Sequence, residues 1–84
     1  MKKGYVALDD YSVIAAGADE EAVKDWVFDF VLRDYDLTEI DEILENLDYQ
    51  SLDDLRMDMV YRGFTDLWEY LGIEFKEAAI IGAD

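Results

Sequence analysis

Hydrophobic and polar residues alternate at both ends of the chain and follow a helical period in the middle. Residues 5–9 and 11–16 have the pattern of two short strands that meet near Asp9 and Asp10, and residues 73–81 have the pattern of a last strand. Alternation with a period of two is typical of half-buried strands. We therefore expect an N-terminal hairpin and a C-terminal strand in one small three-stranded antiparallel sheet.

Four helical segments are expected between the hairpin and the last strand. The first helix is expected over residues 20–34, with Asp19 as its N-cap. The second is capped by Thr38, with Asp41 completing a capping box, and its apolar stripe ends at Leu47. The third runs from Ser51 to Gly63, and a short fourth helix over residues 66–71 lies between Thr65 and Gly72. No linker, repeat or Pro divides the chain. The prediction is a single α+β domain over residues 1–84, with three to four helices on one face of the sheet.

The first predicted helix is apolar on two sides. Residues 22, 23, 26, 27 and 30 form one wide apolar face, and Phe28, Leu32 and Tyr35 lie nearly opposite. Such a helix is either sandwiched between two layers or offers its second face to a partner. We expect the sandwiched arrangement and keep the second interpretation open.

Charge changes the picture of what the domain does. The chain has 22 Asp and Glu against 7 Lys and Arg, a net charge of −15. Such a field repels nucleic acid and anionic membranes, whereas it attracts basic protein surfaces and speeds association with them. The alternative is that the acidity only keeps the protein soluble. No run approaches the roughly 18 apolar residues of a membrane span, and we expect a cytoplasmic protein of a bacterial host.

Several residue types that catalysis commonly uses are missing. The chain contains neither His nor Cys, and its five Gly are scattered rather than gathered in a phosphate-binding loop. We expect little volume for a substrate cleft in so small a domain. Asp34, Asp36, Thr38 and Glu45 match part of a calcium-binding loop, but Glu39 stands where that loop needs Gly. The prediction is a protein that is not an enzyme and that holds no metal or cofactor.

Three rows of carboxylates on the predicted helices are the candidate contact surface for a partner. In the first row, Glu21, Asp25 and Asp29 recur every four residues, a step of ~6 Å along a helix. The second row is Glu39, Glu42 and Glu45, with Asp41 nearby, and the third is Asp54 and Asp58. Few basic residues lie in the helices, so we expect most of this repulsion to be uncompensated and charge reversal at Asp25 and Asp29 to hold or raise stability. The alternative is that these two acids are structural partners of Arg33 or Arg56, in which case the reversal unfolds the chain. The predicted contact residues are these acids, neighbouring acids and two loop tyrosines: Glu21, Asp25, Asp29, Asp34, Tyr35, Asp36, Glu39, Asp41, Glu42, Glu45, Asp48, Tyr49, Asp54 and Asp58.

In its length, its charge and its acidic helices over residues 20–58, the chain resembles the small acidic counter-defence proteins of phages and plasmids. These are the DNA-mimicking antirestriction proteins and the anti-CRISPR proteins. The resemblance implies a protein target, no cofactor, and occupation of a groove meant for DNA or guide RNA. The chain is also similar to acidic immunity proteins and antitoxins. Residues 66–69 resemble a Trp-containing acidic helix of barstar-like inhibitors, although the order of strands and helices in this chain differs from theirs.

The function expected from sequence is therefore inhibition of a host defence enzyme, a CRISPR effector or a restriction enzyme, through its basic nucleic-acid-binding surface. Two alternatives stay open. One is an immunity protein or antitoxin that blocks a basic nuclease toxin, and the other is a structural or assembly module with solubilising acidity. The sequence leaves the oligomeric state undetermined.

Overall fold

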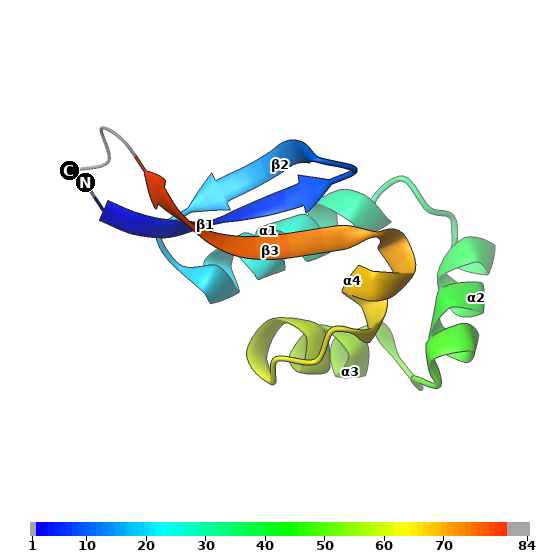
Figure 1. Cartoon of the computed structure of the whole chain (residues 1–84). Coiled ribbons are helices and arrows are strands. Elements are labelled where there is room, and N and C mark those ends of the chain that lie inside the picture. Colours follow the sequence, from blue (N-terminus) through cyan, green and yellow to red (C-terminus); the bar gives the residue numbers. More distant parts are fainter. Residues whose placement is uncertain (1, 81–84) are drawn as a thin grey trace.

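The two ends of the chain form the sheet. In the computed structural model, which describes residues 2–80, strands β1 (Lys2–Asp9), β2 (Ser12–Gly17) and β3 (Ile73–Ile80) are antiparallel in the order β2-β1-β3. Figure 1 shows β1 in the centre of the sheet, between β2, its partner in the N-terminal hairpin, and the C-terminal strand β3. The predicted sheet and the α+β class are confirmed, while Ile81, the last residue of the predicted third strand, lies outside the described residues.

The hairpin turn contains Tyr11, which the sequence pattern had assigned to the second strand. Asp10 and Tyr11 both have positive φ, 51° and 69°, and Asp9 pairs with Ser12 across a two-residue loop. Two positive φ values match the twist of a tight hairpin, although Asn-Gly is the usual choice there. The register then shifts between Ala7 and Leu8, which marks a β-bulge in β2.

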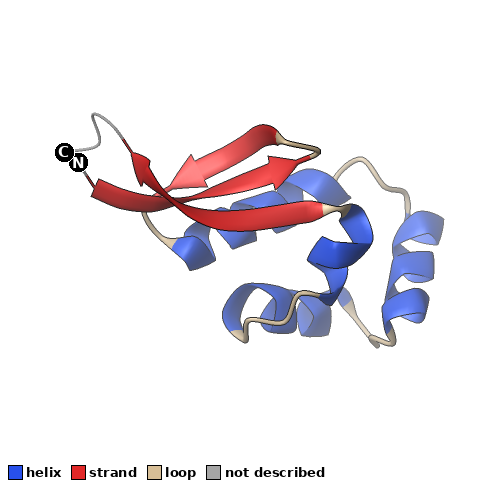
Figure 2. Ribbon diagram, in the orientation of Figure 1, coloured by secondary structure: helices blue, strands red, loops and turns tan. Residues whose placement is uncertain are grey.

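The helices occupy the stretch from residue 20 to residue 71. They are α1 (Glu20–Leu32), α2 (Leu37–Leu47), α3 (Leu52–Arg56) continued by the π-helical turn η1 (Met57–Tyr61), and α4 (Asp66–Leu71). Figure 2 shows the helices gathered beside and below the sheet. The first helix ends at Leu32, two residues before the predicted position 34. The third predicted helix corresponds to α3 and η1 together, which end at Tyr61, before Gly63.

The N-caps follow local sequence, with one correction. Asp19 and Ser51 cap α1 and α3 as predicted. Thr65 stands at the predicted N-cap position of α4, but its side chain makes no capping hydrogen bond. The prediction of Thr38 as the cap of α2 is wrong, because Asp36 accepts a hydrogen bond of 2.8 Å from the Glu39 amide and the Glu39 side chain accepts one from the Asp36 amide. This reciprocal capping box satisfies two amide groups at the start of the helix.

The core lies between the inner face of the sheet and the helices. Ala7, Val27, Leu55 and Leu67 are fully buried, and the ring of Trp68 meets Phe28 and Phe75 edge to face. The Trp68 indole donates a hydrogen bond of 3.2 Å to the Met59 carbonyl. Trp68 is therefore a core residue with its polar atom satisfied, and it is not available to a partner.

Helix α1 packs against the sheet on one side and against η1 on the other. Its buried residues include Val23 and Val27 as well as Phe28 and Leu32, so both predicted apolar faces contribute to packing. Trp26, however, is 52% exposed and Ala22 is exposed as well. The helix is sandwiched along most of its length but keeps an apolar edge in contact with solvent.

Candidate protein-binding surface

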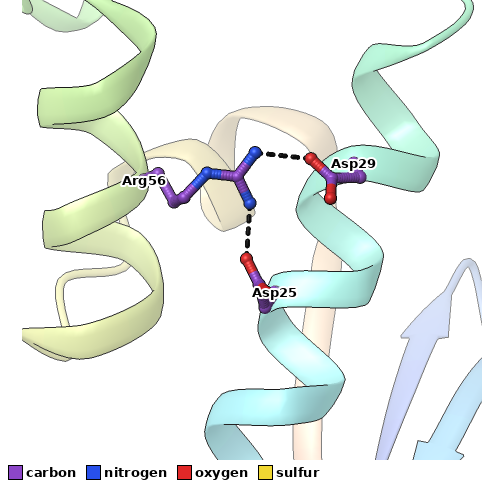
Figure 3. Close-up of polar contacts among 3 residues, drawn as sticks. All are labelled: Asp25, Asp29 and Arg56. Carbon is purple, nitrogen blue, oxygen red and sulfur yellow. Dashed lines mark hydrogen bonds and ion pairs between the residues drawn. The ribbon is translucent and has the colours of Figure 1, made fainter.

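The acidic row on α1 faces α3 and is neutralised there. Arg56 donates one hydrogen bond to Asp25 Oδ1 and another to Asp29 Oδ1, so one guanidinium bridges two carboxylates that lie one helical turn apart (Figure 3). The same guanidinium stacks 4.6 Å from the centroid of the buried Phe28 ring. Arg56 thus ties the first helix to the third through two ion pairs and an aromatic contact.

This arrangement corrects the expectation that the first row lacks counter-charge. Hydrogen bonds to Asp29 and Asp25 raise the pKa of Arg56, although partial burial opposes the shift. Because the residues lie 31 and 27 positions apart in the chain, only the tertiary fold brings them together. Charge reversal at Asp25 and Asp29 would set two cations against Arg56, so the structure favours a loss of stability in that variant rather than an unchanged or higher stability. Glu21, the first acid of the row, is exposed.

The third predicted row is also partly used inside the molecule. Asp58 Oδ2 accepts a hydrogen bond of 2.8 Å from the Tyr49 hydroxyl, and Asp58 Oδ1 accepts one of 3.0 Å from Arg62. Burial of the hydroxyl, together with this hydrogen bond and the charge of Asp58, raises the pKa of Tyr49 to about 12. The pair connects the loop after α2 to η1, while Asp54 on α3 stays exposed.

One end of the molecule collects most of the remaining predicted acids. Helix α2 stands at the end opposite the chain termini (Figure 1), and from residue 34 to residue 55 the chain contains no Lys or Arg. We call the exposed acids of this stretch the acidic end; they lie on α2, in the segments that flank it and in the first turn of α3. The members are Asp34, Asp36, Glu39, Asp41, Glu42, Glu45, Asp48, Asp53 and Asp54.

Apart from Arg33, the basic residues form their ion pairs outside the acidic end. Among residues 3–78 the pairs are Lys3 with Glu77, Lys24 with Glu20, Arg33 with Asp34, Arg56 with Asp25 and Asp29, Arg62 with Asp58, and Lys76 with Glu74. Within that range, Asp34 is the only member of the acidic end that has a cationic partner, at 3.9 Å. The negative charge of the acidic end therefore faces solvent almost without compensation.

Two of these acids stand where they weaken their own helix. Glu45 lies in the last turn of α2 and Asp48 is its C-cap, with a positive φ of 63°, and that turn has no basic residue. Negative charge at a helix C-terminus opposes the helix dipole, at a cost of about 0.3–1 kcal/mol each. An uncharged residue at either position would favour the helix, so local stability does not account for these acids.

The aromatic residues predicted to contact a partner are only partly available. Tyr35 and Tyr49 are half-buried and pack against the core. Leu37, in contrast, is 81% exposed at the start of α2, amid the acids. The sequence pattern did not single it out, because its place three residues before Ile40 is that of a buried position. Only the fold shows that the first turn of α2 extends past the core.

The described residues hold neither a calcium-binding loop nor a cluster of metal ligands. Residues 37–47 form a helix rather than a calcium-binding loop, and within residues 2–80 no three acidic residues gather closely enough to hold a metal ion. An open groove of about 580 Å³ lies between β3 and α4, lined in part by Lys24, Glu69 and Phe75. It forms at the surface between packed elements and so does not need a large domain. None of the described helices is long and apolar enough to cross a bilayer.

The structure thus separates the predicted contact residues into two groups. Those on α1 and η1 are partly occupied by Arg56, Arg62 and Tyr49, whereas those of the acidic end remain open to solvent. Comparison with known protein families, curated proteins and solved structures gives no match to this chain.

Proposed function

We propose that the protein is a non-catalytic inhibitor whose acidic end binds a basic surface of another protein. The target class that fits this charge is the nucleic-acid-binding groove of a host defence enzyme in a bacterial cytoplasm, a CRISPR effector or a restriction enzyme. The observation that supports the proposal is the run of exposed acids from residue 34 to residue 54, which has almost no counter-charge.

The physical argument starts from what such a groove binds. A nucleic-acid groove is lined by Lys and Arg that release counterions when phosphates arrive. Acids placed along α2 and the segments that flank it offer fixed negative charge to the same side chains. Complementary charge accelerates encounter and selects a basic partner. Leu37 adds an exposed apolar contact among the acids, and a desolvated apolar contact strengthens an otherwise polar interface.

Capture from a bacterial lysate, followed by mass spectrometry, tests the proposal. The parent protein should retain a basic nucleic-acid-binding protein. The double reversal Glu42→Lys with Glu45→Lys should lose it. Its folding stability should hold or rise, because it removes repulsion and places cations near a helix C-terminus.

A matched control has the same net charge but a different location. Asp9→Lys with Asp10→Lys changes the hairpin by the same four charge units and should still retain the partner. If both double variants retain it equally, the acidity of α2 is solubilising and the proposal is wrong. If the retained protein is a nuclease toxin encoded beside this chain, the protein is an immunity protein or antitoxin rather than a counter-defence inhibitor.

A further inference from the structure

Strand β2 is an edge of the sheet that carries no charge. It pairs only with β1 among the described residues 2–80, so the backbone groups along its other side face away from the sheet. Its sequence is Ser-Val-Ile-Ala-Ala-Gly, whereas the opposite edge strand, β3, contains Glu74, Lys76 and Glu77. Charged side chains are a common protection of sheet edges against pairing with other chains. In a protein of net charge −15, the uncharged edge is therefore an exception.

An apolar groove runs beside this edge. It lies between β2 and the first half of α1, has a volume of about 540 Å³, and is lined by Ile14, Ala16, Gly17, Ala22 and Trp26, with Asp19 as its single charged residue. The Trp26 ring is half exposed and stacks on Phe30 at a centroid distance of 4.8 Å. An apolar wall is thus held in place next to unpaired backbone groups.

We propose that this edge and groove bind an extended segment of a basic partner protein, which adds to the sheet as a fourth strand beside β2. In this mode of recognition, main-chain hydrogen bonds supply affinity, and alternate side chains of the added strand enter a neighbouring groove. Here these side chains enter between β2 and Trp26. Beyond the bulge, Ala15, Ala16 and Gly17 pair with β1 in a regular register, so their part of the edge is straight enough to continue the sheet.

Length and charge define the occupant. The regular part of β2, Ala15 to Gly17, spans ~10 Å at ~3.3 Å per residue, so about three residues of the partner pair along it and the rest of the segment extends past the bulge. Asp9 and Asp10 flank one end of β2, and Asp19 and Glu21 flank the other. The segment that fits therefore has apolar residues at alternate central positions and Lys or Arg at both ends.

A second copy of this chain fits the edge poorly. Antiparallel pairing of two β2 strands brings the acids at one end of the first copy next to those at the opposite end of the second. Two chains that each have a net charge of −15 also repel each other as wholes. The charge pattern around the edge therefore favours a basic segment over self-association.

The test uses a synthetic peptide with Val at alternate central positions, Thr between them and Arg-Lys at both ends. Titration into the isotopically labelled full chain should shift the amide resonances of Ile14 to Gly17 and the Trp26 indole resonance. The same peptide with N-methyl groups on the amides that face β2 keeps its charge but loses the N–H donors of the main-chain hydrogen bonds. This methylated peptide should bind at least tenfold more weakly. Equal binding of both peptides would overturn the proposal, since attraction would then be electrostatic alone.

Paired variants test the groove. Trp26→Ala should weaken binding of the peptide at least tenfold, whereas Tyr70→Ala, which removes an equally exposed aromatic side chain (52%) from α4, should leave it unchanged. Equal effects of the two substitutions would overturn the proposal. So would the absence of shifts along β2, or a peptide-independent dimer that forms through β2 in sedimentation.

This inference does not depend on the proposed role of the acidic end. Glu42→Lys with Glu45→Lys should leave the shifts along β2 in place, because those acids lie on α2, away from the edge. Asp9→Lys with Asp10→Lys should weaken binding of the isolated peptide, because these residues flank β2, but it should leave capture of the lysate partner through the acidic end in place. If the α2 reversal weakened peptide binding and the hairpin reversal left it unchanged, the site at β2 would be refuted.

Discussion

Removing the charge of Arg56 tests the internal use of the acidic row on α1. Arg56→Met keeps an apolar stem over Phe28 but deletes the hydrogen bonds to Asp25 and Asp29. It also leaves these two carboxylates facing each other one turn apart. The substitution therefore removes the two ion pairs and the cation–π contact, and it adds repulsion between the two Asp.

The size of the effect follows from the environment of the guanidinium. Its side chain is 31% exposed, so the ion pairs are partly screened and together contribute about 1–2 kcal/mol rather than the full value of buried pairs. Loss of the cation–π contact adds about 0.5 kcal/mol, and unopposed repulsion between the two Asp adds about 0.3 kcal/mol. We expect Arg56→Met to lower the free energy of unfolding by about 2–3 kcal/mol.

Urea unfolding followed by circular dichroism measures this loss. A double-mutant cycle with Asp25→Asn plus Asp29→Asn isolates the coupling, which should be at least about 1 kcal/mol because the groups are in contact. The reversal Asp25→Lys with Asp29→Lys should destabilise the chain. A loss below about 0.5 kcal/mol for Arg56→Met, or a gain in stability from the reversal, would refute the pairing.

Three further predictions concern backbone fit and pH. Tyr11→Gly should raise the free energy of unfolding by about 1 kcal/mol, since Tyr11 has a φ of 69° and is 95% exposed; no gain in a thermal melt would contradict this. Gly17→Ala should cost about 1–3 kcal/mol, because a Cβ there would lie 2.9 Å from Val23 Cγ2, and most of the cost should vanish when Val23 is Ala. The hydrogen bond from Tyr49 should stabilise the fold fully below pH about 10, the ordinary pKa of Tyr, and lose this effect as the pH rises through about 12. Tyr49→Phe should remove this alkaline decline from the pH–stability profile, and an unchanged decline would contradict the assignment.

Local signals in the sequence carried most of the fold. Alternation at the two ends, Asp19 and Ser51 as caps, and Gly72 as a left-handed helix end are all short-range features, and each was predictable. The N-cap at Asp36 was also predictable, since Asp-Leu-Thr-Glu contains the two acids of a capping box. Thr38 was predicted instead because its hydroxyl is also a favourable N-cap group. The turn at Tyr11 was missed because that residue is a good strand former and the turn lacks Gly.

The candidate surface was only partly predictable, because it depends on contacts between distant residues. Neither the pairing of Arg56 with α1 nor the exposure of Leu37 and Trp26 follows from spacing along one helix. Spacing shows which residues share a face, but not which face another element covers. The acids of α2 were predictable as exposed, since the stripe from Ile40 to Leu47 fixes the opposite side.

Competition with nucleic acid tests the central claim most directly. The partner retained from lysate is loaded with a fluorescently labelled nucleic acid, and the parent protein is titrated while anisotropy is recorded. The parent protein should displace the nucleic acid, whereas the Glu42→Lys, Glu45→Lys variant should not. Displacement by the parent should weaken as the salt concentration increases, because charges are screened within ~10 Å at 0.1 M. If the partner holds the nucleic acid and this protein at the same time, the acidic end does not occupy the groove and the account is contradicted.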